Sequence, residues 1–449
     1  MAGEERIAVY GAGAVGAYVG GYMTRDGRDV TLIDPWEAHV NLMRDPGLKL
    51  SGLTEPENFQ VKCNAVLDAD LPPPGDPSGN GGPFDVIFIC VKSFDTEAAA
   101  KRMKAYLADD GFMVSLQNGI NEGTIADVVG KDKTMGCIAS AISVSMWEPG
   151  AVRRNVKLGG TEHIVFRAGE LDGSVTPRAR RIAEILSSID SAKVTETLMG
   201  ERWSKLIVNC MRNPISAASG MASNACDTDD HIRRLGIRIG AESIQVAMAE
   251  GYPLEKILGM PPEQILAAGQ GDADAMAACD KKLLDDRAKR SDEQRPSMAQ
   301  DMVKGRPTEI DFINGFVVRS AEAHGIAVPA NAGIVAAIKA IEAGKMTPSP
   351  EAIAEAPTRT LALLALALIL NMGGHLVVRM VATAAMPGPS ARTTGYIFGN
   401  RNIAVVLASV PFDPTLTLFV ALMQAPIYAT PALFSFLDRP RPCPRSSES

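Results

Sequence analysis

The sequence predicts a doubly wound α/β sheet, followed by an all-α domain and an apolar helical tail. Short apolar runs alternate with helical patterns up to about residue 116, which is typical of a sheet with helices on both faces. From about residue 195 the strand alternation stops. After residue 360 the composition turns strongly apolar. The expected units are residues 1–194, residues 195–346, a linker at 347–359 and the tail at 360–449.

The first unit reads as strands and helices in alternation. Strands are expected at 7–10, 29–33, 84–91 and 112–116, and helices at 15–25 and 96–107. The run 84–91 is strongly apolar, as a strand buried on both faces requires. Residues 71–83 are rich in Pro and Gly and cannot form regular structure. We expect a surface loop there, because the pattern resumes too soon afterwards for a domain linker, which is the alternative.

The second unit shows helical patterns without strand alternation. They lie around 198–212, 230–250, 262–286 and 308–343. Ala, Met, Leu and charged residues dominate these segments. A separate, all-helical domain is therefore expected after the sheet.

The composition excludes some classes of function. The formal net charge is −7 and 5% of the residues are aromatic, so the sequence offers no basic or stacking surface for nucleic acid. The seven cysteines form no C-x-x-C pair, which favours free thiols in a reducing cytosol. The polar segment 1–6 leads directly into a strand and does not resemble a secretory signal. A cytoplasmic protein is expected for the first two units.

A glycine-rich segment, GAGAVG at 11–16, lies between the first strand and the first helix. Gly11 permits a tight turn, Gly13 lets the backbone approach a pyrophosphate, and Gly16 lets helix and strand pack closely. The first helical residues, Ala14 and Val15, then meet the phosphate charge. This is the G-x-G-x-x-G pattern of Rossmann-type dinucleotide binding. A purely structural glycine turn is the alternative.

Asp34 ends the second strand, close to the spacing expected of the acid that binds the adenosine ribose. A carboxylate there accepts hydrogen bonds from both ribose hydroxyls and repels a 2′-phosphate. NAD(P)H is thus the expected cofactor, and Asp34 favours NADH over NADPH. The alternative is that Asp34 caps the turn that follows it.

Polar residues follow two other strands and cover one helix face. Lys92 and Asn118 end neighbouring strands, at the carboxyl edge where ligands bind in such sheets. Lys205, Asn209 and Asn213 lie at i, i+4 and i+8 and share one face of a helix. A site at the sheet edge is the functional interpretation of these residues. Solvated side chains and a surface stripe are the alternatives.

These motifs, in this order, resemble the ketopantoate reductase (2-dehydropantoate 2-reductase) family over about residues 5–345. The blocks that carry the resemblance are GAGAVG, VKS, LQNG, W-x-KL-x-x-N-x-x-x-NP, S-M-x-QD, G-R-x-TEIDFING and HGIAVPAN. The resemblance implies a Rossmann domain followed by a helical domain, and reduction of a 2-oxo acid by NAD(P)H. Segment 251–296 is longer than in compact members, so the exact 2-oxo acid is less certain than the reaction.

The resemblance also implies roles for single residues. Lys205 matches the lysine that donates a proton to the ketone oxygen, and Glu309 the acid that binds the substrate hydroxyl. The polar residues that bind the substrate are matched by Asn209, Asn213 and Ser297. The residues that contact the cofactor and position the site are matched by Lys92 and Asn118. An ammonium suits the chemistry, because hydride addition builds negative charge on the carbonyl oxygen.

Other functions stay open beside this one. The family commonly carries Arg or Lys just after the second strand for the 2′-phosphate, whereas this chain has Asp34-Pro35-Trp36. The rivals are a reductase for a different small 2-oxo acid and a membrane-tethered protein that senses nucleotide or serves transport. The few histidines show no ligand spacing, so no metal is expected. A homodimer is an open possibility for the enzyme.

The tail contains two apolar segments, 360–385 and 415–437. The second is uncharged and would span roughly 34 Å as a helix, enough for a bilayer. The stretch around Gly399-Asn400-Arg401-Asn402 weakly resembles a fragment of the bile acid:sodium symporter family. Membrane contact through 360–437 is one interpretation of the tail. A functionless fused fragment and a soluble helical hairpin are the others.

Overall fold

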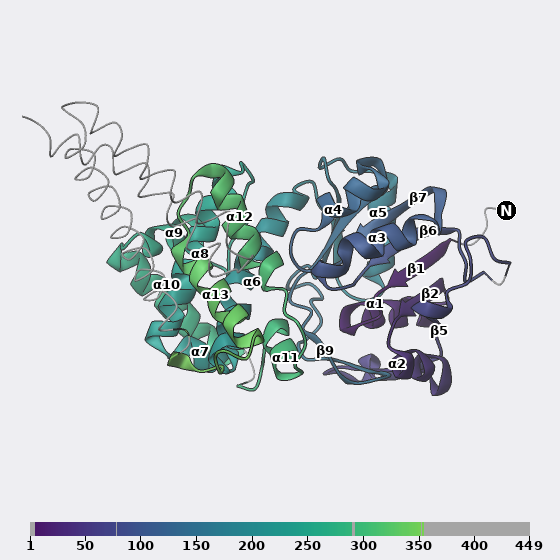
Figure 1. The fold of residues 1–449 in the computed structure, drawn as a ribbon, viewed down its shortest axis with the longest axis horizontal. Coiled ribbons are helices and arrows are strands. Elements are labelled where there is room, and N and C mark those ends of the chain that lie inside the picture. Colours follow the sequence, from purple (N-terminus) through teal and green to yellow (C-terminus); the bar gives the residue numbers. More distant parts are fainter. Residues whose placement is uncertain (1–4, 78, 290–291, 352, 354–449) are drawn as a thin grey trace, which may run out of the picture.

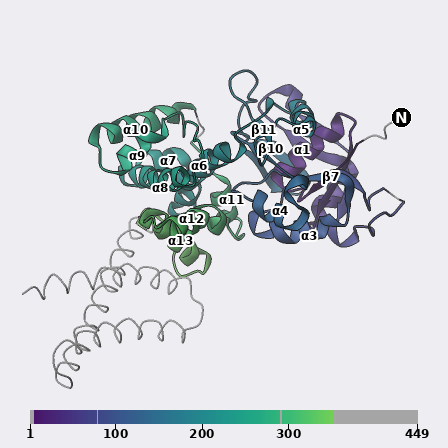
Figure 2. The same cartoon turned by 90° about the horizontal axis from the view of Figure 1, so that it is seen from above.

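The computed structural model describes residues 5–77, 79–289, 292–351 and 353. Figure 1 shows a sheet flanked by helices at one end and a group of helices at the other. Figure 2, turned by 90°, shows the same two parts side by side. The chain leaves the sheet after β12 (Ala192–Val194) and enters the helical part with α6 (Leu198–Ser219).

Eight strands form the larger sheet within the described residues, in the order β12-β11-β8-β7-β6-β1-β2-β5. The strands from β5 to β8 are mutually parallel, and β11 is antiparallel to β8. Their bounds are β1 (Arg6–Tyr10), β2 (Asp29–Asp34), β5 (Asn64–Leu67), β6 (Phe84–Ile89), β7 (Leu107–Ser115), β8 (Thr134–Ala139) and β11 (Phe166–Glu170). The predicted α/β sheet is confirmed, with β6 ending two residues earlier than expected.

Helices cover both faces of this sheet because its strands bury alternate side chains on opposite sides. Along β6, Val86 and Phe88 face one core and Ile87 and Ile89 face the other. The first core includes α1 (Ala14–Arg25) and α5 (Pro177–Ser187), and the second includes α3 (Thr96–Lys104) and α4 (Glu122–Val129). Residues 71–77 and 79–83 form no helix or strand, as predicted for the loop.

A second, smaller sheet was not foreseen from the sequence. It has the order β4-β3-β10-β9, and its strands are β3 (Leu48–Ser51), β4 (Phe59–Val61), β9 (Val144–Glu148) and β10 (Ala151–Arg154). The sheet packs on α1 at Gly21, where an added Cβ would lie 2.7 Å from Leu50 and 2.8 Å from Leu48. These strands have three to five residues, too few to give a clear alternation.

The second part is helical, as predicted, but two of the long patterns are broken. Pattern 262–286 splits into α9 (Pro262–Gly269) and α10 (Ala273–Asp285), because Gly271 has a φ of +102° and Asp272 caps the next helix. Pattern 308–343 splits into η7 (Ile310–Phe312), α12 (Asn314–His324) and α13 (Pro329–Glu342). The other helices in the described residues of this part are α7 (Ser223–Thr228), α8 (Asp230–Ala249), η6 (Asp286–Lys289) and α11 (Ser297–Val303).

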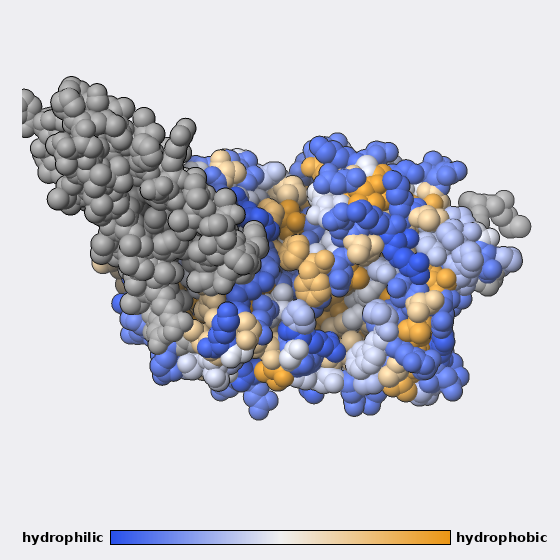
Figure 3. Space-filling view, viewed as in Figure 1, coloured by the Kyte–Doolittle hydropathy of each residue, from blue (hydrophilic) through white to orange (hydrophobic). Residues whose placement is uncertain are grey.

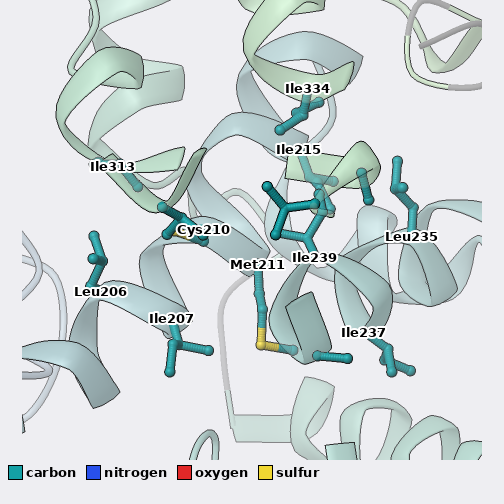
Figure 4. Packing of buried hydrophobic residues seen from close by; sticks show 14 of the residues in the cluster. Leu206, Ile207, Cys210, Met211, Ile215, Leu235, Ile237, Ile239, Ile313 and Ile334 are labelled. Atoms are coloured by element: carbon teal, nitrogen blue, oxygen red, sulfur yellow. The ribbon is translucent and has the colours of Figure 1, made fainter. Parts of the chain in front are cut away.

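One apolar core holds the helical part together. Figure 4 shows side chains of this buried cluster, among them Leu206 and Met211 of α6, Ile237 and Ile239 of α8 and Ile334 of α13. The surface is mainly hydrophilic on the face shown in Figure 3, with apolar residues in the middle of the view where the two parts meet. The predicted site residues of α6 therefore lie on a helix whose apolar side chains are buried in this core.

The tail predictions lie outside the described residues. The structure describes only 347–351 and 353 of the predicted linker, and there Ser349 N–H donates to Ala218 O. Residues 354–449, with the expected membrane helices and the symporter-like stretch, are not described. Within the described ranges, no helix is both long and apolar enough to cross a membrane.

Candidate active site

The glycine-rich loop fits a dinucleotide by its geometry. Gly11 has a φ of +91°, and an added Cβ would lie 2.7 Å from Val91 N. At Gly16 an added Cβ would lie 2.2 Å from Gly11 O, whereas at Gly13 it would meet no atom within 4 Å. Two glycines are thus required by close packing, and the third faces open space at the start of α1. No side chain caps this helix, so the backbone amides of Ala14 and Val15 are available to a phosphate.

A buried histidine, His39, forms a hydrogen bond with the backbone of this loop. His39, in α2 (Glu37–Leu42), accepts the Gly150 N–H at Nδ1 over 2.8 Å. Because Nδ1 is an acceptor, the proton of the neutral ring lies on Nε2, which donates to Ala12 O over 2.8 Å. Burial lowers the pKa of His39, against the opposing effects of the Ala12 carbonyl and Asp34. His39 is one of the histidines without ligand spacing, and no local signal in the sequence links it to the loop.

Asp34 ends β2 beside the same loop and is 9% exposed. Its Oδ1 accepts the backbone N–H of Trp36 over 2.9 Å, so the turn cap considered from the sequence is present. Burial raises the pKa of Asp34, while the Trp36 amide, His39 and the Arg306 guanidinium oppose that rise. A backbone hydrogen bond from Ala12 also lowers the pKa of Asp34, so the carboxylate faces backbone donors of both the turn and the glycine-rich loop.

Lys92 joins the sheet edge to the helical part. It follows β6, and its Nζ donates to Asp301 Oδ2 over 2.5 Å and to Glu309 Oε2 over 3.3 Å. Burial alone would lower the pKa of Lys92, but the two carboxylates outweigh it and raise the pKa. The ammonium is therefore held charged between α11 and the turn before η7.

The other oxygen of Glu309 is also engaged. Oε1 accepts the backbone N–H of Ser93 over 2.9 Å and the Ser93 hydroxyl over 2.8 Å. The same hydroxyl lies 3.2 Å from Asn118 O, which also accepts from Asn121 Nδ2 over 2.7 Å. The structure thus brings Glu309, Lys92 and Asn118 together, as expected. Ser93 and Asp301 belong to quoted motifs, VKS and S-M-x-QD, but were not singled out.

Lys205 lies on α6 without a partner. Among the residues that the structure describes, none forms a hydrogen bond or an ion pair with its Nζ. Burial, followed by the positive charge of Arg202, lowers the pKa of Lys205 to about 7, while Cys137, Glu309 and Glu122 oppose this. The influence of Glu309 shows that its carboxylate lies within electrostatic range of the Lys205 amine. As a whole residue Lys205 is half-buried, and its backbone is held in α6.

The neighbouring asparagines share this face of α6. The Asn209 amide nitrogen is buried and has no hydrogen-bond partner among the described residues. Such a group costs about 1–3 kcal/mol, which a ligand oxygen would relieve. Asn213 is 6% exposed. Ser297 opens α11, four residues before Asp301, and is half-buried.

Arg202 fixes α6 against the sheet. Its Nε donates to Glu122 Oε1 over 2.7 Å, Nη1 to Gln117 O over 2.8 Å and Nη2 to Ser115 O over 2.9 Å. Both Arg202 and Glu122 are 1% exposed. This buried pair sets the position of Lys205 one turn later. The sequence analysis missed it because charged residues are seldom buried and their pairing over 80 residues leaves no local pattern.

Two family models match the chain. The model described as "Ketopantoate reductase PanE/ApbA" matches residues 7–166, and "Ketopantoate reductase PanE/ApbA C terminal" matches residues 197–342. The 2-dehydropantoate 2-reductase of Pyrococcus horikoshii is 29% identical over 347 residues, covering 75% of this chain and 97% of that protein. The enzyme of the same name from Archaeoglobus fulgidus is 27% identical, covering 76% and 99%.

Solved structures share the fold. A PanE/ApbA family ketopantoate reductase from Ralstonia eutropha JMP134 has a TM-score of 0.59 and 28% identity, covering 76% of this chain and 99% of that chain. A ternary D-mandelate dehydrogenase structure with NADH and anilino(oxo)acetate has a TM-score of 0.61, the same coverages and 22% identity. The second likeness is one of fold alone.

Proposed function

Because the chain belongs to the ketopantoate reductase family of NAD(P)-dependent oxidoreductases, we propose that it reduces the keto group of ketopantoate or a related 2-oxo acid, with Lys205 as the proton donor. The observation that carries this proposal is the unpaired Lys205 amine. Its pKa of about 7 suits a general acid at neutral pH. An unpartnered buried amide, that of Asn209, lies one turn away on the same helix.

Each residue has a part in the proposed reaction. NAD(P)H supplies the hydride when bound over the glycine-rich loop. Lys205 donates its proton to the ketone oxygen as negative charge develops there, which is typically worth about 10²–10⁴-fold in rate. The Asn209 amide donates to the substrate carboxylate or keto oxygen. Glu309 accepts from the substrate hydroxyl, and it exchanges part of its contact with Ser93 and Lys92 for this purpose.

The remaining predicted residues are proposed to line the same space. Asn213 and Ser297 are proposed to complete the substrate contacts. Lys92 and Asn118 are proposed to position Glu309 and the nicotinamide end of the cofactor. This assignment agrees with the hydrogen bonds that join Lys92 to Glu309 and Asn118 to Ser93.

Ketopantoate is the first candidate substrate. The relatives named above reduce 2-dehydropantoate, as their names state. A bulkier 2-oxo acid is the second candidate, because a protein of the same fold binds anilino(oxo)acetate together with NADH. A homodimer is also proposed, since a ketopantoate reductase of Staphylococcus aureus with this fold is described as dimeric. Size-exclusion chromatography with light scattering distinguishes a dimer from a monomer.

NADH is proposed as the preferred cofactor. Asp34 lies where a carboxylate accepts from both ribose hydroxyls. Solved structures of the same fold contain NADH. The preference is tested by comparing kcat/KM for NADH and NADPH at saturating substrate.

One assay tests the main proposal. The purified full-length chain is mixed with ketopantoate, phenylglyoxylate or pyruvate, each with NADH and NADPH, and absorbance loss at the nicotinamide band is followed. We expect turnover of ketopantoate in both cofactor arms, faster with NADH. Turnover of phenylglyoxylate alone would support the second candidate. No turnover of any 2-oxo acid would refute the reductase proposal.

Membrane contact through 360–437 remains a prediction from the sequence. Alkaline carbonate washing of membranes from expressing cells tests it. An integral segment keeps the chain in the pellet, whereas a chain released into the supernatant excludes an anchor. The reductase assay above does not depend on either outcome.

A further inference from the structure

A proline interrupts the hydrogen bonds of α6 among the predicted site residues. In an α-helix each N–H donates to the carbonyl four residues earlier, but proline has no N–H and its ring crowds that carbonyl. Pro214 is buried inside α6, so Cys210 O loses its usual donor. Lys205 and Asn209 lie before this break, and Asn213 lies at it. The break thus falls within the part of the helix that carries the proposed substrate contacts.

A side-chain amide takes the place of the missing donor. Asn314 Nδ2 donates to Cys210 O over 3.4 Å and to Asn331 Oδ1 over 3.0 Å. The first bond is long, but Asn314 and Cys210 are both fully buried, so no bulk water competes for that carbonyl. Figure 4 shows Ile313, the residue before Asn314, close to Cys210. The contact joins α6 to the start of α12.

Neighbouring residues hold the Asn314 amide in this orientation. Asn331, which is also fully buried, donates from Nδ2 to Ile239 O over 3.2 Å and to Glu242 Oε2 over 2.9 Å. Its Oδ1 is then left to face Asn314, from which it accepts. Glu242 also accepts the backbone N–H groups of Ala330 and Asn331, each over 2.9 Å. A chain of hydrogen bonds from α8 and α13 thus ends at one carbonyl of α6.

Packing alone does not account for an asparagine at this position. Asn314 Oδ1 is buried and has no hydrogen-bond partner among the described residues, which costs free energy. An apolar side chain of similar shape would fill the same space without that cost. Only a side chain with donors can serve the carbonyl that Pro214 leaves open, so the asparagine is explained by this contact.

Asn314 also belongs to the segment that carries Glu309. Only η7 and Ile313 separate the two residues. Arg202 fixes the first turns of α6 on the sheet through its guanidinium hydrogen bonds. Asn314 supplies a second attachment, just beyond Asn209. Its hydrogen bond therefore sets how the middle of this helix lies relative to the Glu309 carboxylate.

We propose that Asn314 is a positioning residue of the reductase, because its amide replaces the N–H that Pro214 lacks and so fixes both halves of α6 relative to Glu309. Its hydrogen-bonded neighbours keep the amide turned toward the α6 carbonyl. Without this bond, Asn209 and Asn213 lose their fixed orientation toward the substrate. The inference rests on the proposed function, because Asn314 is fully buried and acts only through residues that contact the substrate.

A double-mutant cycle in the full-length protein tests the pairing of Asn314 with Pro214. Wild type, Asn314→Leu, Pro214→Ala and the double variant are compared by kcat and KM for ketopantoate, NADH dissociation constant and thermal unfolding. Asn314→Leu should lower kcat by about 10-fold or more, because small misplacements of catalytic groups are costly. In the double variant alanine supplies the missing N–H, so most of that loss should be recovered. NADH affinity should stay that of the wild type, since the glycine-rich loop is untouched.

Ser216→Ala is the matched control. Ser216 is a buried residue of α6 whose hydroxyl donates to Met221 O over 2.6 Å, so its replacement also removes a buried hydrogen bond. This variant should unfold at a lower temperature while its kcat stays that of the wild type. If Asn314→Leu does not fold, Asn314→Ser is measured in its place, because the shorter hydroxyl cannot reach both acceptors.

The inference and the proposed function fail in different ways. A wild type that reduces no 2-oxo acid would make both of them wrong. With an active wild type, the inference alone is wrong if kcat of Asn314→Leu falls no further than that of Ser216→Ala, or if NADH affinity falls as much as kcat. It is also wrong if Pro214→Ala brings no recovery in the double variant. A loss of kcat that the second substitution reverses supports it.

Discussion

Replacement of Lys205 should lower activity and raise stability in the same protein. Lys205→Met removes the proposed proton donor, so kcat should fall by at least about 10²-fold. The pKa of this amine falls from 10.5 to about 7, chiefly through burial. At about 1.4 kcal/mol per pH unit, the charged amine carries a penalty of at most about 5 kcal/mol. An apolar side chain of similar length avoids that penalty.

The sign of the pH dependence follows from this pKa. The folded-state pKa lies below the unfolded value, so between about pH 7 and pH 10.5 the unfolded chain binds the extra proton. Wild-type stability due to this group therefore rises with pH through that window, and the advantage of Lys205→Met shrinks. The general acid acts protonated, so wild-type kcat/KM should fall as pH rises through about 7.

The assays are a pH–rate profile with ketopantoate and thermal unfolding at pH 6.5 and pH 9. Lys281→Ala serves as the control, because Lys281 is an exposed lysine of α10 in a surface ion pair. A loss of kcat smaller than about 10-fold would remove Lys205 from the acid role. An equal stability difference at both pH values would show that burial does not depress its pKa.

Three further predictions concern the residues around it. Asn209→Ala should lower kcat/KM by about 10–100-fold through loss of a hydrogen bond to a charged substrate, with NADH affinity unchanged; equal kinetics would exclude a substrate contact. His39→Ala should weaken NADH binding in calorimetry by about 10-fold, because Ala12 O loses a donor beneath the loop; unchanged binding would make this residue merely structural. Lys92→Met removes the cation that pairs with Glu309, an acid that acts on Lys205, so the alkaline limb of the pH–rate profile should move to higher pH; an unmoved limb would contradict the charge coupling.

The sequence was sufficient where function depends on neighbouring residues along the chain. The glycine turn follows directly from a short pattern, and so does the shared face of Lys205 and Asn209 on one helix. Both are local features, because a tight turn and a helix face are each determined by residues close together in the sequence. The fold class was predictable for the same reason, since β6 and α6 are long and strongly patterned.

Contacts between distant segments could not be predicted in this way. Lys92 and Glu309 are separated by 217 residues, and Gly150 and His39 by 111. The family resemblance supplied Lys92 and Glu309 as separate roles, without their contact. Nothing singled out His39, because its partners Ala12 and Gly150 are brought near only by the tertiary fold. The small sheet was missed for a related reason, since its strands pair across the chain and are too short to show a period.

The arrangement of charges explains why Lys205 is the group left to react. Lys92 takes both carboxylates of the site, Asp301 and Glu309, although Glu309 is also close to Lys205. If Glu309 were paired with Lys205 instead, the ion pair would raise the pKa of that amine and hold its proton. Arg202 acts in the same direction from the other side, since it is buried and its charge disfavours a second cation one turn away. The Lys92 ammonium is thus kept charged by its two carboxylates, so that the Lys205 amine can give up its proton near neutral pH.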